Sequence, residues 1–163
     1  MAAHAFELMT LLDAPGVGPA RVRKLLKKWQ TVPETPLLDN DLLREMLTES
    51  QVAALPASQE RIKKHWGELE NRGVNVVSVL DPNYPNALRH LLGDKAPLVL
   101  MCVGNLAIFE KVSVGFCGSR DASEKGLRVA WDSAALLAHH GINVVSGFAT
   151  GVDRRSPDVS PPR

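Results

Sequence analysis

Two short apolar segments, each followed at once by a glycine-bearing turn, most constrain what this chain can fold into. The first segment spans residues 112–117 and leads into the turn 118–120, and the second spans 142–145 and leads into the small-residue stretch 146–153. A strand, a tight turn and a helix, repeated in this order, build the phosphate-binding edge of an open α/β sheet. The sequence therefore predicts a βαβ unit with a ligand-binding edge.

A helix-forming stretch separates the two turns. Residues 123–140 carry apolar side chains at helical spacing, and Gly141 follows where such a helix should end. The side chains that we expect to face the sheet are Leu127, Ala130, Trp131, Ala134, Leu137 and Ala138. A right-handed crossover would set the two strands parallel and bring both turns to the same edge. The fold class that this pattern indicates is α/β.

The two turns carry the chemistry of a phosphate site. Arg120 supplies a planar fork of donors, Lys125 a mobile cation and Ser119 a hydroxyl. Ser123 is placed to cap the helix, whose N-terminus has partial positive charge. The candidate phosphate-binding residues are Gly118, Ser119, Arg120, Ser123, Lys125, Ser146, Gly147 and Gly151. Asp153 could bind a ribose hydroxyl or order its own loop, and small residues also fill such turns without any ligand, so both interpretations stay open.

The first part of the chain, residues 1–72, has a helical rather than an alternating pattern. The stretches with helical spacing of apolar residues are 6–12, 22–29, 42–47 and 62–69. Thr48 and Ser58 are expected to be the N-caps of two separate helices, the second of which ends at Gly73. We therefore predict a helical domain over residues 1–72.

The pattern changes at residue 74. A β-branched run over 74–80 and an apolar run over 98–103 predict two strands. The break at 81–85 and a short helix over 86–92 separate them. Together with the βαβ unit, these elements predict a partial Rossmann-like domain over 73–153 with a parallel sheet.

A second candidate phosphate site lies near the N-terminus, where residues 15–20 resemble a helix-hairpin-helix turn. The basic residues that follow it are Arg21, Arg23, Lys24, Lys27 and Lys28. Exposed amides and cations of this kind could hold nucleic-acid phosphates without sequence preference. The rest of the segment is acidic enough to cancel this charge, so we favour a packed helical hairpin with a solvated basic face.

Charge and cysteine usage narrow the classes of function. The 163 residues have a formal net charge of +1, so a case for nucleic-acid binding must rest on local clustering. Cys102 and Cys117 lie in apolar runs without metal-ligand spacing, which predicts reduced core thiols in a cytoplasmic protein. Residues 1–16 have neither the basic start of a signal peptide nor the apolar length of a membrane span. We expect no catalytic residue, metal or cofactor.

In combination, these segments resemble DNA-processing protein A, the Smf family of bacterial DNA-uptake and recombination mediators. The resemblance runs from about residue 6 to residue 153. It rests on four stretches in the family's order, which are the hairpin 15–18, the segment 81–88, the segment 97–105 and the two glycine-bearing turns.

The resemblance implies a small SAM-like helical domain followed by an extended Rossmann-type domain. Family members bind single-stranded DNA without sequence preference, help to load a RecA-type recombinase on it during natural transformation, form homodimers and are not known as enzymes. The family's phosphate-holding arginine matches Arg120. Its glycine-turn neighbours match Gly118, Ser119, Ser146, Gly147 and Gly151.

The chain departs from the family pattern after Asp153. Residues 154–163 contain three prolines and lack the Ala-His-containing helix and the further strands of the family, so we expect a disordered tail. A frameshifted or truncated gene would explain this end and would leave apolar surfaces and partner contacts incomplete. Two alternatives stay open, namely a nucleotide-binding or phosphoribohydrolase-type Rossmann protein and an inactive remnant.

Overall fold

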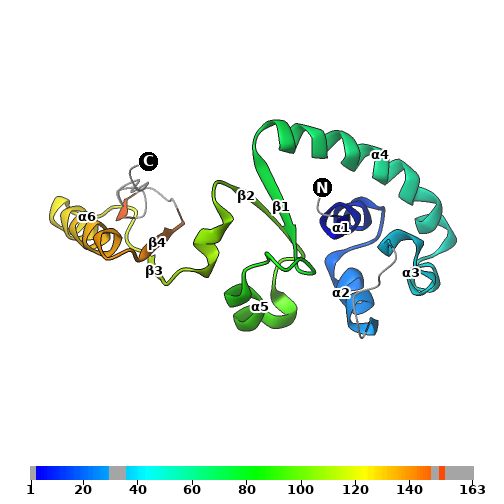
Figure 1. The fold of residues 1–163 in the computed structure, drawn as a ribbon, viewed down its shortest axis with the longest axis horizontal. Helices are drawn as coiled ribbons and strands as arrows, with labels where there is room; N and C mark the ends of the chain where they lie inside the picture. The colour runs from blue at the N-terminus through cyan, green and yellow to red at the C-terminus, as the bar shows by residue number, and fades with distance from the viewer. Residues whose placement is uncertain (1–2, 30–35, 148–150, 153–163) are drawn as a thin grey trace. The chain divides into compact units, whose positions relative to one another are not determined.

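The computed structural model describes residues 3–29, 36–147 and 151–152 of the chain (Figure 1). The chain divides into two compact units, Met1–Leu106 and Ala107–Arg163. The expected disordered tail at 154–163, together with Asp153, lies outside the described residues. Among the described helices, none combines the length and apolar character needed to cross a bilayer.

The first unit begins with a bundle of helices around one core. These elements are α1 (Ala3–Asp13), α2 (Pro19–Lys28), the 3-10 turn η1 (Leu37–Asp39), α3 (Asp41–Met46) and α4 (Glu49–Asn71). Pro19 sits in the first turn of α2, where its missing N–H costs nothing, and Asn40 caps α3 by accepting from the Leu42 N–H at 3.0 Å. The fully buried side chains Leu8, Leu11 and Leu43 form the centre of the core.

Helix α4 is one continuous helix, and the expectation of two helices with Ser58 as the second N-cap is wrong. Thr48 does cap α4, through a capping box with Gln51. Ser58 instead lies inside the helix, fully buried, and its hydroxyl accepts from Arg61 Nη2 at 3.0 Å. The helix continues past Pro56 because burial of Leu55, Ile62 and Trp66 against the core outweighs the single lost backbone hydrogen bond.

Two strands complete the sheet of the first unit, β1 (Val74–Ser78) and β2 (Val99–Val103). They pair antiparallel, with Val76 opposite Met101. The expectation of one parallel sheet over 73–153 is therefore wrong for these strands. The physical reason is the connection, which folds back on itself so that the Val79 N–H donates to the Leu98 carbonyl at 2.9 Å, as at the end of a hairpin.

The connection between β1 and β2 carries the short helix α5 (Asn86–Leu92) and the 3-10 turn η2 (Gly93–Lys95). Tyr84 is fully buried in it and donates its hydroxyl to the Pro97 carbonyl at 2.9 Å. Arg89 donates to the carbonyls of Val79 and Asp81, both at 3.1 Å, and its guanidinium lies 5.6 Å from the Tyr84 ring centre. Tyr84, in the segment 81–88 that the family resemblance singled out, and Arg89, directly after it, therefore stabilise the conformation of this connection.

The second unit contains a parallel βαβ arrangement, as predicted. After the 3-10 turn η3 (Leu106–Glu110), which spans the boundary between the units, come β3 (Ser113–Phe116), α6 (Glu124–His139) and β4 (Asn143–Ser146). Strands β3 and β4 pair in parallel, with Ser113 opposite Asn143 and Phe116 opposite Ser146. This confirms the parallel pairing that the two apolar segments predicted.

Two core expectations for the second unit are corrected. Ala130 and Ala134 of α6 are buried, but Trp131 is 49% exposed. Neighbouring residues on a helix point about 100° apart. The face of α6 that packs inward carries Ala130 and Ala134, so Trp131 lies at the border of this face and is partly open to solvent. Cys117 is exposed where β3 gives way to the turn, whereas Cys102 in β2 is half-buried, and burial raises the pKa of its thiol.

Candidate nucleic-acid interface

The register of β3 and β4 places the two glycine-bearing turns at the same edge. Phe116 and Ser146 are the last residues of their strands and lie opposite each other. Both strands run in the same direction, so the chain leaves both of them at the carboxyl edge of the sheet. The turn beginning at Gly118 and the turn beginning at Gly147 therefore start side by side, as the sequence predicted.

The two turns pack against each other through glycines. Gly151 has φ +93°, and a β-carbon on it would lie 2.3 Å from the Ser119 carbonyl oxygen and 2.7 Å from that of Arg120. A β-carbon on Gly118 would lie 2.7 Å from the β-carbon of Val152. The Val152 N–H donates to the Ser119 carbonyl at 3.4 Å. Any side chain at either glycine would force these two turns apart.

The serine side chains of the site shape the backbone between β3 and α6. Ser119 Oγ accepts from the Asp121 N–H at 3.1 Å, which closes a local turn. Ser123 Oγ accepts from the Gly126 N–H at 3.2 Å and caps α6, as predicted. Each hydroxyl accepts in these contacts and so keeps its own proton as a donor for a ligand oxygen.

The charged members of the site are open to solvent. Arg120 and Lys125 are both exposed, and they flank the N-terminus of α6, where the helix dipole adds partial positive charge. Asp121 and Glu124 lie between them in the sequence and partly offset their charge. The site is therefore mildly rather than strongly basic, and its attraction for an anion depends on directed donors more than on net charge.

The predicted members Ser146 and Gly147 are placed at the same edge. Ser146 ends β4 and is half-buried, and Gly147 follows it and is exposed. Residues 148–150, between Gly147 and Gly151, lie outside the described residues. Of the predicted site, the structure thus brings Ser119 and Arg120 into contact with Gly151, and Gly118 into contact with Val152.

Three of the five basic side chains of the N-terminal hairpin make contacts within the first unit. Arg21 donates to Gln51 Oε1 at 2.6 Å, and Arg23 donates to the Ala96 carbonyl at 2.7 Å. Lys27 forms an ion pair with Asp94. These contacts support the packed hairpin that the sequence analysis favoured over a phosphate site.

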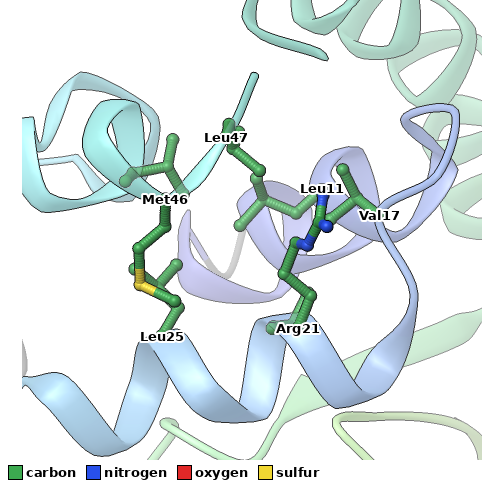
Figure 2. A pocket seen from close by; sticks show the side chains of 8 residues that line it. Leu11, Val17, Arg21, Leu25, Met46 and Leu47 are labelled. Carbon is green, nitrogen blue, oxygen red and sulfur yellow. The ribbon is translucent and has the colours of Figure 1, made fainter.

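The space beneath the hairpin is part of the core. Figure 2 shows the side chains of Leu11, Val17, Leu25 and Met46 around this space, with Arg21 at its side. Its volume is about 10 Å³, which is hardly enough for one water molecule. The hairpin therefore provides no ligand cavity here.

A larger hollow, which sequence reasoning missed, lies in the first unit beside β1. Its volume is about 340 Å³, and Trp66, Glu70, Val76 and Asp81 are among its lining residues. The β-branched run that marks β1 gives no signal of this hollow, because the sequence does not show which edge of the strand is paired. Within the described residues, no group of three or more His, Cys, Asp or Glu side chains is placed to hold a metal ion.

Comparison with known proteins gives the family. The family model for DNA recombination-mediator protein A matches residues 58–159. The DNA processing protein DprA of Bacillus subtilis (strain 168) is 24% identical over 143 residues, which cover 83% of this chain and 47% of that protein. The crystal structure of DNA processing protein A (DprA) from Streptococcus pneumoniae shares the fold, with a TM-score of 0.68 at 24% identity over 96% of this chain and 53% of that one.

This chain spans about half the length of the two relatives. The family model nevertheless covers more than half of the chain, including both glycine-bearing turns of the candidate site. The chain belongs to the DNA recombination-mediator protein A family, the DprA/Smf proteins.

Proposed function

We propose that this protein binds single-stranded DNA without sequence preference, through its phosphates, at the edge formed by the two glycine-bearing turns. The observation that carries the proposal is the contact of Gly151 with the backbone of Ser119 and Arg120. This contact fixes the main chain from which the Arg120 side chain extends into solvent. The proposed contact residues are Gly118, Ser119, Arg120, Ser123, Lys125, Ser146, Gly147 and Gly151.

The chemistry of these residues suits phosphate better than bases. A guanidinium fork, an ammonium group, hydroxyls and a helix N-terminus all favour anionic oxygens. None of the eight residues has an aromatic ring on which a base could stack. Contacts of this kind position a nucleic-acid strand without reading its sequence, and their strength falls as salt rises.

In this proposal the protein acts in the cytoplasm as a recombination mediator that presents the bound strand to a RecA-type recombinase, and as a homodimer. Its residues 1–72 form a SAM-like domain and its residues 73–153 a Rossmann-like one. Membership of the DNA recombination-mediator protein A family supports the mediator role. The proposal assigns no catalytic step, metal or cofactor to the site.

The DNA-binding part is tested by fluorescence anisotropy with a labelled oligothymidylate at low salt. Replacing Arg120 by Gln removes a charged, forked donor, so the affinity should fall about tenfold. The matched control is Lys111→Gln, which removes the same charge from the exposed segment before β3, at the opposite end of that strand. Equal losses in both variants would show a general charge effect and would reject the site.

The mediator part needs a separate readout. A RecA-type recombinase hydrolyses ATP when it assembles on single-stranded DNA, so a mediator should shorten the lag of hydrolysis on DNA covered by a single-strand-binding protein. An unchanged lag, with DNA binding intact, would reject the mediator role and leave the DNA site standing. Turnover of nucleoside monophosphates by the purified protein would instead favour the phosphoribohydrolase alternative.

A further inference from the structure

One edge of β1 has main-chain groups that its partner strand does not use. The Val79 N–H donates to the Leu98 carbonyl, so the residues of β1 that share this direction, Val77 and Asn75, also face β2. The N–H and carbonyl groups of Val74, Val76 and Ser78 must then point to the other side. Among the described residues, one edge of β1 is thus hydrogen-bonded to β2, and the other edge has no partner strand.

Asp81 already occupies the end of this open edge. Its carboxylate accepts from the Ser78 N–H at 2.6 Å, and its own N–H donates to the Ser78 carbonyl at 2.9 Å. Asp81 therefore takes both outward groups of Ser78, as a neighbouring strand would. Among the described residues, the N–H and carbonyl groups of Val76 have no such partner.

The hollow of about 340 Å³ runs along this same edge. Four consecutive residues of β1, from Val74 to Val77, line it, which fits a groove along a strand rather than a pit on one face. Trp66 and Glu70 of α4 also line the hollow, as do Asp81 and the two residues after it. The space lies directly beside the unpaired main-chain groups of Val76.

The charge of the groove selects its occupant. Glu70 and Asp81 are its charged lining residues, and both are acidic. Glu70 lies in the last turn of α4, four residues before β1 begins at Val74, whereas Asp81 binds Ser78 at the other end of β1. The two acidic residues therefore belong to opposite ends of the strand. Such a groove repels nucleic-acid phosphates. It also disfavours a second copy of this chain, because an antiparallel pair of two β1 strands would set the carboxylate of Glu70 in one copy against that of Asp81 in the other.

We propose that the open edge of β1 is a docking site for an extended, basic segment of a protein partner, which adds to β1 as a further strand. Main-chain hydrogen bonds to Val74 and Val76 supply the affinity, and lysine or arginine side chains near Glu70 and Asp81 supply the selectivity. This site is in the first unit and does not depend on DNA binding at the glycine-bearing turns.

The direct test is hydrogen exchange of the full chain with a probe peptide. The probe is an acetylated, amidated peptide with an arginine at each end and alternating threonine and valine between them, used at about 1 mM. Exchange at the Val76 amide should slow, while the already bonded Val77 amide should change little. An unchanged Val76 amide at this concentration would overturn the proposal.

Two altered peptides test the mode of binding. Methylation of alternate amides removes the donors of one peptide edge and should abolish the protection, while a peptide with glutamate at both ends should bind more weakly. Equal binding of either altered peptide would overturn the proposal. Protection of Val76 that rises with protein concentration in the absence of peptide would show that a second copy is the occupant, and would overturn it as well.

A charge-matched pair of variants tests the role of the groove. Glu70→Gln keeps an oxygen that accepts from Trp66 Nε1, a bond of 2.8 Å in the native chain, but removes the charge. Peptide affinity should fall about two- to fivefold, as expected for an exposed ion pair. The control is Glu68→Gln, which removes the same charge from α4 at a position that does not line the groove and should leave the affinity unchanged. Equal losses of peptide affinity in both variants would contradict the role of Glu70 in the groove.

Discussion

Gly151 lies so close to Arg120 that a β-carbon on Gly151 would be 2.8 Å from the α-carbon of Arg120. The two residues belong to different βα turns and are 31 positions apart in the sequence. Their contact joins the two turns at the carboxyl edge of β3 and β4, where the proposed phosphate contacts lie. The close approach thus makes the shape of the site depend on a residue that has no side chain.

Gly151→Ala should destabilise the second unit. A non-glycine residue at φ +93° is strained, and the added carbon would overlap the Ser119 and Arg120 carbonyl oxygens. The free energy of unfolding should fall by about 1–3 kcal/mol. Urea unfolding measures the loss, and faster exchange of the Val152 amide should locate it.

The control for this prediction is Gly115→Ala in β3. A β-carbon at Gly115 meets nothing within 4 Å, and its φ lies outside the left-handed region. Stability should stay unchanged or rise slightly, because alanine restricts the unfolded chain more than glycine does. Equal destabilisation by the two changes would contradict the contact between the turns.

The salt dependence of DNA binding should report the number of phosphates held. For single strands the slope of log affinity against log salt is about −0.7 for each phosphate neutralised. Arg120→Gln should therefore make the slope shallower by about 0.7, whereas Lys111→Gln should leave it unchanged. Anisotropy titrations over a series of salt concentrations measure both slopes, and parallel lines for the native protein and Arg120→Gln would remove Arg120 from the interface.

Stability at alkaline pH should depend on Tyr84. Burial raises the pKa of Tyr84 above 10.0, with Arg23 and Arg89 acting in the opposite direction. The unfolded chain therefore loses this proton at lower pH than the folded chain does, so stability is retained below about pH 10 and falls as the pH rises further. Tyr84 is the one tyrosine of the chain, so tyrosinate absorbance measures its pKa directly.

The matched variant for this pH effect is Tyr84→Phe. It should be about 1 kcal/mol less stable near neutral pH, because the Pro97 carbonyl loses its donor. Above pH 10 the loss of stability with rising pH should be smaller in the variant than in the native protein. The same alkaline loss in both proteins would assign the effect to other groups.

The capping box of α4 should be worth a measurable part of the stability. Thr48→Ala removes the oxygen that accepts from the Gln51 N–H at 3.3 Å, and should lower the free energy of unfolding by about 1 kcal/mol. Thr48→Ser keeps a capping hydroxyl and should stay close to the native value. Thermal or urea unfolding separates these outcomes, and a silent Thr48→Ala would mean that α4 starts elsewhere.

Local sequence signals predicted the elements of the βαβ unit well. The apolar runs before Gly118 and before Gly147 are strands, Ser123 caps the helix between them, and Gly141 follows its end at φ +71°. Each of these outcomes depends on side chains or glycines only a few residues apart. For the same reason, the positions of the strands 74–80 and 98–103 and of the short helix between them were predictable to within a few residues.

Errors arose where distant contacts decided the outcome. The expectation that a second helix begins at Ser58 was wrong, because packing of Ile62 and Trp66 into the core keeps α4 continuous through Pro56. Trp131 has core spacing in the sequence, yet the buried face of α6 is the one with the small residues Ala130 and Ala134. Helical spacing identifies a stripe of apolar residues but not which part of it a neighbouring element covers.

By itself the sequence determined the family, the glycine-bearing turns and the parallel pair of strands, because motif spacing, turn chemistry and apolar patterning are local. The tertiary structure alone decided that β1 and β2 run antiparallel, that Gly151 touches Arg120, and that the outward edge of Val76 borders a groove. These features depend on where the chain turns back on itself. Local sequence patterns cannot predict this, because a hydrogen bond such as that from Val79 to Leu98 joins residues that are far apart in the sequence.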